Sequence, residues 1–259
     1  MKQEERLLFL IKALLREAHM QEIEIPKDYT AQKRLYRALC NIREPKPLND
    51  SFLNIQDAFL QEENQKDGIT SIDDLTSKEK GIYLWQGDIT TLKVDAIVNA
   101  ANSALLGCFI PEHGCIDNII HTKSGNQLRL YCDEIMRKQG HLEPIGHAKI
   151  TPAFNLPCRY ILHTVGPIVQ GTLQVSQKKQ LALCYRSCLE LACKHQCTSI
   201  AFCCISTGEF HFPNALACQI AIDTVRSFLK ENNYPIQVIF NVFKDQDRIL
   251  YERELNTYA

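Results

Sequence analysis

The first 77 residues carry their apolar side chains at helical spacing. Leucines and isoleucines between residues 7 and 15 recur at intervals of three and four positions, which is the pattern of an amphipathic helix. Pro26 ends this pattern, and two further helices are predicted over 29–41 and 52–65. This part has almost no strand signal. We therefore predict a small helical extension over residues 1–77.

The rest of the chain, residues 78–259, alternates between two patterns. Strand-like apolar runs lie at 83–86, 96–100, 160–165, 199–205 and 237–243. Helical patterns lie at 127–139, 178–195, 213–231 and 245–258. This alternation predicts an α/β domain with a largely parallel central sheet. Because ligands of such sheets bind beyond the carboxyl ends of the strands, a site is expected in the loops that follow them.

Composition narrows the class of protein. The chain has 259 residues, with 29 Lys and Arg against 30 Asp and Glu and a formal net charge of −1. Proteins that bind nucleic acids or anionic membranes are normally basic, so both partners are disfavoured. No apolar stretch reaches the roughly 18 residues of a membrane span, and no signal peptide is recognisable, so we expect a cytoplasmic protein. The oligomeric state stays open.

The chain has 12 cysteines, which are expected to be thiols in a reducing compartment. Most are interpreted as packed side chains, including Cys203 and Cys204 inside a predicted strand. His163 is likewise interpreted as a structural histidine in a strand. His121, four residues after Asp117, is interpreted as its local partner.

Polar residues gather in the loops after three of the predicted strands. These loops read Gly87-Asp88-Ile89-Thr90, Asn99-Ala100-Ala101-Asn102 and Ser206-Thr207-Gly208-Glu209-Phe210. Each loop by itself has an ordinary explanation, since Asp and Asn are common in caps and turns. A Ser-Thr-Gly loop before a helix also offers backbone N–H groups that suit a phosphate. The glycine-rich fingerprints of dinucleotide sites and P-loops are absent from the sequence.

Taken together, in this order and spacing, the loops resemble those of the macrodomain, the ADP-ribose-binding module. The resemblance rests on GDIT (87–90), VDAIVNAAN (94–102), CIDNIIH (115–121), YILHTVGP (160–167) and ISTGEFHFP (205–213). It implies a three-layer α/β/α sandwich over residues 78–259, with a central mixed, largely parallel sheet. The helical extension over 1–77 lies outside the resemblance.

The resemblance also implies roles for the loop residues. Asp88 would accept a hydrogen bond from the adenine amino group, and Ile89 would lend a backbone N–H nearby. The backbone N–H groups from Ser206 to Glu209 would wrap the diphosphate. Phe210 would pack against the distal ribose, and Asn102 would hydrogen-bond one of its hydroxyls.

The stretch after the Asn-Ala-Ala-Asn motif departs from most hydrolytic macrodomains, which are glycine-rich there. It places Cys108, His113 and Cys115 in the pattern C-x4-H-x-C. Cysteine and histidine together favour Zn²⁺, and three protein ligands leave one tetrahedral position open, as in catalytic zinc sites. The chain in this respect resembles the zinc-containing microbial macrodomains, which implies a zinc cofactor. The candidates for a fourth ligand are Cys132, His141 and His147.

The resemblance implies hydrolysis of the bond between ADP-ribose and a modified protein side chain. Asp117 aligns with the acidic residue of hydrolytic macrodomains and would orient or deprotonate water, while Asn102 would fix the ribose. Glu209 is a second carboxylate near the site. Two alternatives stay open: a reader that binds ADP-ribosylated proteins without cleaving them, and an adaptor with a structural zinc whose N-terminal helices are its docking surface.

Overall fold

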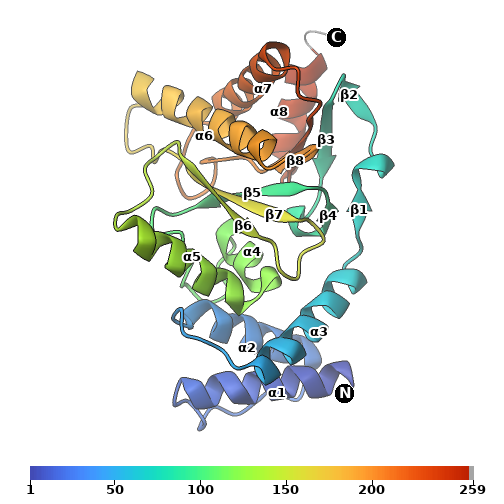
Figure 1. The fold of residues 1–259 in the computed structure, drawn as a ribbon, viewed down its shortest axis with the longest axis vertical. Helices are drawn as coiled ribbons and strands as arrows, with labels where there is room; N and C mark the ends of the chain where they lie inside the picture. Colours follow the sequence, from blue (N-terminus) through green and yellow to red (C-terminus); the bar gives the residue numbers. More distant parts are fainter. Residues whose placement is uncertain (257–259) are drawn as a thin grey trace.

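The structure of the protein is a computed structural model, which describes residues 1–256. A helical part that contains the N-terminus forms one end of the molecule, and an α/β part forms the remainder (Figure 1). All twelve cysteines are free thiols. Within the described residues, no helix is long and apolar enough to cross a membrane.

The N-terminal part has three helices, α1 (Gln3–Glu17), α2 (Tyr29–Ile42) and α3 (Asp50–Lys66). The predicted second and third helices are thereby confirmed. The side chains of Asp28 and Asn49 cap α2 and α3, each accepting a hydrogen bond from a backbone N–H of the first turn. The apolar faces of the three helices meet in a core of their own, which includes Leu10, Tyr36 and Phe59.

The α/β part is built on a seven-stranded sheet in the order β2-β3-β9-β8-β5-β7-β6. Its strands are β2 (Ser77–Glu79), β3 (Ile82–Gln86), β9 (Gln237–Val242), β8 (Ser199–Phe202), β5 (Ala96–Ala101), β7 (Tyr160–Val165) and β6 (Ala148–Pro152). The five central strands are parallel, and the two edge strands β2 and β6 are antiparallel to their neighbours. The sheet is therefore mixed and largely parallel, as predicted.

Helices cover both faces of this sheet (Figure 1). They are α4 (Ile116–Ser124), α5 (Asn126–Gln139), α6 (Val175–Lys194), α7 (Asn214–Glu231) and α8 (Asp245–Asn256). α4 and α5 lie on the side of the N-terminal helices, and α6 and α7 lie on the opposite side. The three-layer α/β/α prediction is confirmed. The last two residues of the helix predicted over 245–258 lie outside the described residues.

The structure corrects some local predictions. The strand expected over 199–205 ends at Phe202, so Cys203 and Cys204 lie beyond it rather than inside it. The reason is that β8 pairs with β5 only as far as Ala201 and with β9 only as far as Phe202, after which the chain leaves the sheet while remaining apolar. β6 and α4 were not predicted. The boundary expected at 77/78 stays a prediction, and β1 (Thr70–Ser71) already pairs with β4 (Leu92–Lys93) of the α/β part.

Candidate active site

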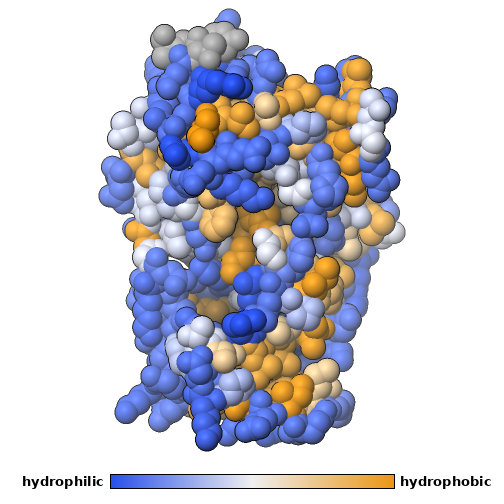
Figure 2. Space-filling model, turned by 180° about the vertical axis from the view of Figure 1, so that it is seen from behind, coloured by the Kyte–Doolittle hydropathy of each residue, from blue (hydrophilic) through white to orange (hydrophobic). Residues whose placement is uncertain are grey.

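A cavity of about 910 Å³ opens at the carboxyl ends of β3, β5, β8 and β9, where the loops after these strands meet α2 and α4. A volume of this size is typical of small-molecule and cofactor sites. The face of the molecule turned away from the view of Figure 1 is hollowed near its middle, with apolar residues in the floor and polar residues around it (Figure 2).

Apart from the three candidates for a fourth metal ligand, the residues that the sequence marked for binding, catalysis or metal ligation line this cavity. They are Asp88, Ile89, Asn102, Cys108, His113, Cys115, Asp117, Ser206, Thr207, Gly208, Glu209 and Phe210. They come from three segments that are far apart in the sequence, at 88–89, 102–117 and 206–210. The structure thus brings the predicted site together, while the role of each residue stays a prediction.

The two carboxylate oxygens of Asp88 make different contacts. Its Oδ1 accepts hydrogen bonds from the backbone N–H of Thr90 at 2.9 Å and from the Thr90 hydroxyl at 2.6 Å, which caps the short 3-10 helix η2 (Ile89–Thr91). Its Oδ2 lies 2.9 Å from Nζ of Lys123. Burial acts to raise the pKa of Asp88, but the Thr90 hydrogen bonds and the Lys123 charge outweigh it and hold the pKa below its ordinary value. Asp88 is thus a fixed anion, with acceptor sites left for a ligand amine.

The loop from Ser206 to Phe210 lines the cavity, and most of its backbone N–H groups are free within residues 1–256. The N–H of Thr207 donates weakly to the carbonyl of Cys204 at 3.4 Å. Among the described residues, the N–H groups of Ser206, Gly208, Glu209 and Phe210 have no hydrogen-bond acceptor. Ser206 has a φ of 65°, a left-handed conformation that helps to turn successive N–H groups toward one point. This arrangement suits an anion such as a diphosphate.

Asp117 lies in the first turn of α4 and is only 5% exposed. Its Oδ1 accepts a hydrogen bond from Nδ2 of Asn99 at 2.7 Å, and its Oδ2 accepts one from Nδ2 of Asn102 at 3.3 Å. Burial raises the pKa of Asp117 to about 6, although Asn99 and Arg129 act in the opposite direction. A carboxyl group with such a pKa is ionised at neutral pH and is well matched to accept a proton.

A chain of hydrogen bonds continues from Asp117 into the core. Nδ2 of Asn99 donates one of its two hydrogens to Asp117 and lies 3.1 Å from Nδ1 of His163. Since an amide nitrogen can only donate, its second hydrogen goes to Nδ1 of His163. Nδ1 is then the acceptor, so Nε2 of His163 carries the proton and donates to Oγ1 of Thr151 at 3.0 Å. Both ring nitrogens of His163 have partners, which confirms its interpretation as a structural histidine.

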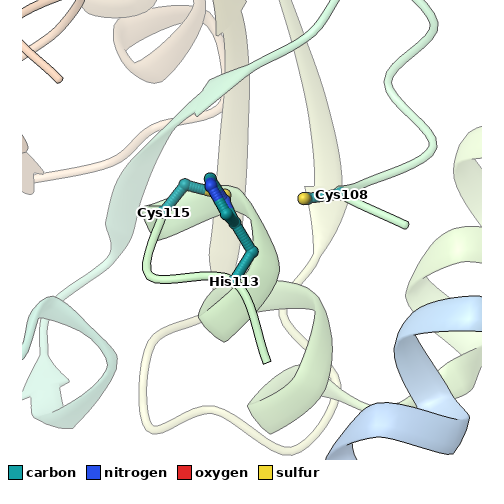
Figure 3. A group of neighbouring side chains, drawn as sticks. All are labelled: Cys108, His113 and Cys115. Carbon is teal, nitrogen blue, oxygen red and sulfur yellow. The ribbon is translucent and has the colours of Figure 1, made fainter. Parts of the chain in front are cut away.

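Cys108, His113 and Cys115, called here the metal-loop group, offer ligand atoms that all lie within 4.8 Å of one another. Cys108 approaches from one side, and His113 and Cys115 approach from the other, where the loop enters α4 (Figure 3). The loop passes Gly107 at a φ of +77°, and a Cβ there would lie 2.8 Å from the ring of His121, so a glycine is required. The group is half-buried in the cavity wall.

The metal-loop group fits a zinc ion. Two sulfurs bonded to zinc at tetrahedral angles are about 3.8 Å apart, so the ligand atoms are already close to the required separation. Nδ1 of His113 is buried without a hydrogen-bond partner. Burial, together with the neighbouring Cys108 and Asp117, raises the pKa of the Cys115 thiol to about 12. A divalent cation would remove this penalty by stabilising the thiolates.

No fourth Cys, His, Asp or Glu of residues 1–256 joins the metal-loop group. The candidate ligands His141 and His147 lie outside the cavity lining, and Cys132 belongs to a different group. Glu209 is close by, with Oε1 at 3.8 Å from Nε2 of His113, and its side chain is 69% exposed. The group therefore keeps the three-ligand character that the sequence predicts.

His121, Cys132 and His163, called here the buried group, form a second cluster with ligand atoms within 4.8 Å of one another. All three are buried, and the two imidazoles are held neutral because burial lowers the pKa of each, that of His163 to about 3. Nε2 of His121 lies 3.6 Å from Oδ1 of Asp117, too far for a hydrogen bond, so the predicted pairing is a proximity only. Both ring nitrogens of His121 lack a hydrogen-bond partner among the described residues, but His163 is already fully bonded, and we therefore interpret the buried group as a structural cluster.

Two residues at the site were missed by sequence reasoning. Asn99, which contacts Asp117, lies inside the VDAIVNAAN motif, and that motif is the signal that could have found it. Arg37 of α2 also lines the cavity. It comes from the helical extension, where nothing in the sequence distinguishes it from other surface arginines.

Comparisons with known proteins agree with this geometry. The model of the Macro domain family matches residues 98–221. A protein-ADP-ribose hydrolase of Treponema medium is 53% identical over 258 residues, which cover 98% of this chain and 99% of the relative. The chain belongs to the macrodomain family.

Two further proteins place this macrodomain among its relatives. A protein-ADP-ribose hydrolase of Staphylococcus aureus (strain MSSA476) is 50% identical over 258 residues, covering 98% of this chain and 96% of the relative. The solved structure of a Trypanosoma brucei macrodomain in complex with ADP-ribose has a TM-score of 0.66 and 29% identity, covering 83% of this chain and 94% of that chain. Because the bacterial relatives match along nearly the whole chain, the similarity includes the N-terminal helices.

Proposed function

We propose that this macrodomain is a zinc-dependent protein-ADP-ribose hydrolase that removes mono-ADP-ribose from modified protein side chains. One observation carries the proposal: the metal-loop group and Asp117 share one cavity with the loops that suit ADP-ribose. The names of the full-length relatives support the hydrolase part. The choice of zinc rests on the chemistry of Cys108, His113 and Cys115.

Two parts of the cavity lining bind different parts of the substrate in this proposal. Asp88 is a fixed carboxylate that can accept a hydrogen bond from the adenine amine. The N–H groups of Ser206, Gly208, Glu209 and Phe210 can hold the diphosphate without any basic side chain. Binding the remote parts of the substrate in this way places the distal ribose near Asn102 and Asp117.

Asp117 is the proton acceptor in this proposal. Its two oxygens are oriented by Asn99 and Asn102, so the carboxylate cannot rotate freely. From this position it can orient a water molecule and take its proton while the water oxygen bonds to the anomeric carbon and the protein side chain leaves with the electron pair of the broken bond. A zinc ion held by Cys108, His113 and Cys115 would supply Lewis-acid chemistry beside the distal ribose.

The proposal is tested with the purified full chain, its zinc content and a mono-ADP-ribosylated protein. We expect about one zinc per chain, release of ADP-ribose, and loss of both after chelation, with activity restored by added zinc. Retention of the modification, with ADP-ribose still bound, would instead establish a reader. Full hydrolysis by verified zinc-free protein would refute the zinc part.

A further inference from the structure

One face of α2 meets the loop that carries the metal-loop group. Nη2 of Arg37 donates to the backbone carbonyl of His113 at 2.7 Å. Nε and Nη2 of the same side chain also donate to Oδ1 of Asn118 at 3.0 and 2.7 Å. One helical turn further on, Oδ1 of Asn41 accepts from the backbone N–H of Glu112 at 2.9 Å. The N-terminal helices therefore contact the backbone of the loop at two successive residues.

We propose that Arg37 is a positioning residue for zinc: from α2 it fixes the backbone at His113 and so preorganises the metal-loop group. This inference rests on the proposed function, because it concerns the same zinc site. By this inference the helical extension supports the zinc site, although it lies outside the matched Macro domain residues 98–221. In this role Arg37 acts on the zinc site through His113 and Asn118.

The loop needs such support, because residues 107–115 form no helix or strand. Glu112, directly before His113, has a φ of 53°, a conformation that residues other than glycine rarely adopt. Nδ2 of Asn118 donates to the carbonyl of Ile110 at 3.0 Å, so Asn118 links Arg37 to the far side of the same turn. Removing Arg37 leaves this turn with fewer contacts to hold it against its backbone strain.

α2 is itself fixed relative to the loop by a buried arginine, Arg129 of α5. Its Nη1 donates to the carbonyls of Cys40 and Asn41 at the end of α2, at 3.0 and 2.8 Å. Its Nε donates to the carbonyl of Leu106 at 2.6 Å, just before the loop, and its guanidinium lies 4.1 Å from the ring centroid of Phe109. One side chain thus joins the helix end to the start of the loop, which makes α2 a firm support for Arg37.

Arg34 offers a matched control on the same face of α2. It pairs with Glu112 through two contacts, at 2.7 and 3.2 Å, but it bonds only the carboxylate and its own side chain is 70% exposed. Exposed pairs of this kind contribute about 0–1 kcal/mol. Gln56 of α3 offers a second control, since it bonds Asn126 and Gln127 of α5 and so holds the same two parts together without touching the loop.

The experiment measures zinc affinity by competition with a chromophoric chelator, in the full chain and in three variants: Arg37→Ala, Arg34→Ala and Gln56→Ala. We expect Arg37→Ala to weaken zinc binding about tenfold or more, as is typical for residues that orient metal ligands. Arg34→Ala and Gln56→Ala are expected to stay within about twofold, because neither bonds the loop backbone. Arg37→Lys is expected to recover only part of the affinity, since an ammonium group lacks the fork that reaches His113 and Asn118 together.

Two further readouts separate positioning from stability. The thermal midpoint of each zinc-free variant shows whether it folds, and the visible absorption of the cobalt-loaded protein reports the ligand geometry at the site. A shifted cobalt spectrum in Arg37→Ala, with the fold intact, supports the inference. Unchanged zinc affinity in Arg37→Ala, or an equal loss in Gln56→Ala, overturns it. A wild-type chain that binds no zinc would overturn the proposed function itself, which is a different result.

Discussion

The metal-loop group and the buried group have the same chemistry and opposite surroundings. Each consists of cysteine and histidine with ligand atoms within 4.8 Å of one another. The metal-loop group is half-buried, lies in a cavity wall and includes a ring nitrogen, Nδ1 of His113, that has no partner. In the buried group, His163 is fully bonded to Asn99 and Thr151, while both ring nitrogens of His121 lack a partner in the described part of the chain. Residue type and distance alone therefore do not distinguish a metal site from a core cluster.

The difference lies in what each group would lose by binding a metal. A metal at the buried group must displace the hydrogen bonds of His163 and place a charge in a dry interior, which is costly. A metal at the metal-loop group displaces no side-chain hydrogen bond of His113 that the structure describes and stays in reach of solvent. Asp117 lies between the two, with Asn99 joining it to His163 on the buried side. The predictions below test this division of roles.

The largest effect is expected for Cys108→Ala. Loss of a ligand should abolish zinc binding and lower kcat/KM by at least about 100-fold, since residues that only orient ligands already cost 10- to 100-fold in affinity or activity. Zinc content and hydrolysis of an ADP-ribosylated protein are the measurements. The matched control is Cys132→Ala in the buried group, which should keep its zinc. Loss of zinc from Cys132→Ala alone would reverse the assignment of the two groups.

Asp117→Asn is expected to have the next largest effect. The amide keeps the size of the side chain but cannot take a proton, so kcat should fall about 100-fold or more. ADP-ribose affinity, measured by calorimetry, should change only a few-fold, because Asp117 is not needed to hold the adenine or the diphosphate. An equal loss of binding and turnover would make Asp117 a binding or structural residue instead.

The sequence predicted which residues lie together where these residues are close to one another along the chain. The three metal-loop residues lie within eight positions of one another, and their spacing has no helical or strand period to explain it. The loops after β3, β5 and β8 were found for the same reason, since each is a short motif at a strand end. The strand boundary at Phe202 was missed because residues 203–205 stay apolar after leaving the sheet.

Contacts between distant segments could not be predicted from the sequence. His121, Cys132 and His163 come from α4, α5 and β7, so only the folded chain brings them together. Arg37 is 76 positions from His113, and its role depends on how α2 packs against the loop. Hydrophobic periodicity predicted that α2 exists but carried no information about its partner.

Acid is expected to destabilise the protein through the buried group. The folded state keeps His163 neutral, with a pKa of about 3, whereas in the unfolded chain it takes up a proton below its ordinary value of about 6.5. The unfolded state therefore binds more protons between these values. The stability that His163 contributes should be fully present above pH 6.5 and fall as the pH drops, by up to about 1.4 kcal/mol per pH unit.

This pH effect is measured by urea unfolding of zinc-free protein at pH 7, 6 and 5, because zinc release from protonated ligands would otherwise add its own acid sensitivity. As the pH drops, the free energy of unfolding of His163→Gln should fall less steeply than that of the wild type. The difference in slope should correspond to one proton, about 1.4 kcal/mol per pH unit. Equal slopes in the two proteins would show that His163 is not held neutral by the fold.

The smallest effect is expected for Thr151→Val, which keeps the shape of the side chain and removes the hydroxyl that accepts from Nε2 of His163. The unpaired N–H should cost about 1–3 kcal/mol of unfolding free energy. Thr164→Val is the control, because its buried hydroxyl donates to the carbonyl of His147 and contacts the thiols of Cys184 and Cys188, none of which belongs to either group. Both variants should unfold more easily and retain zinc. If Thr151→Val lost its zinc while Thr164→Val kept it, the two groups would be coupled through Asn99 and Asp117, and the buried group would be part of the metal centre after all.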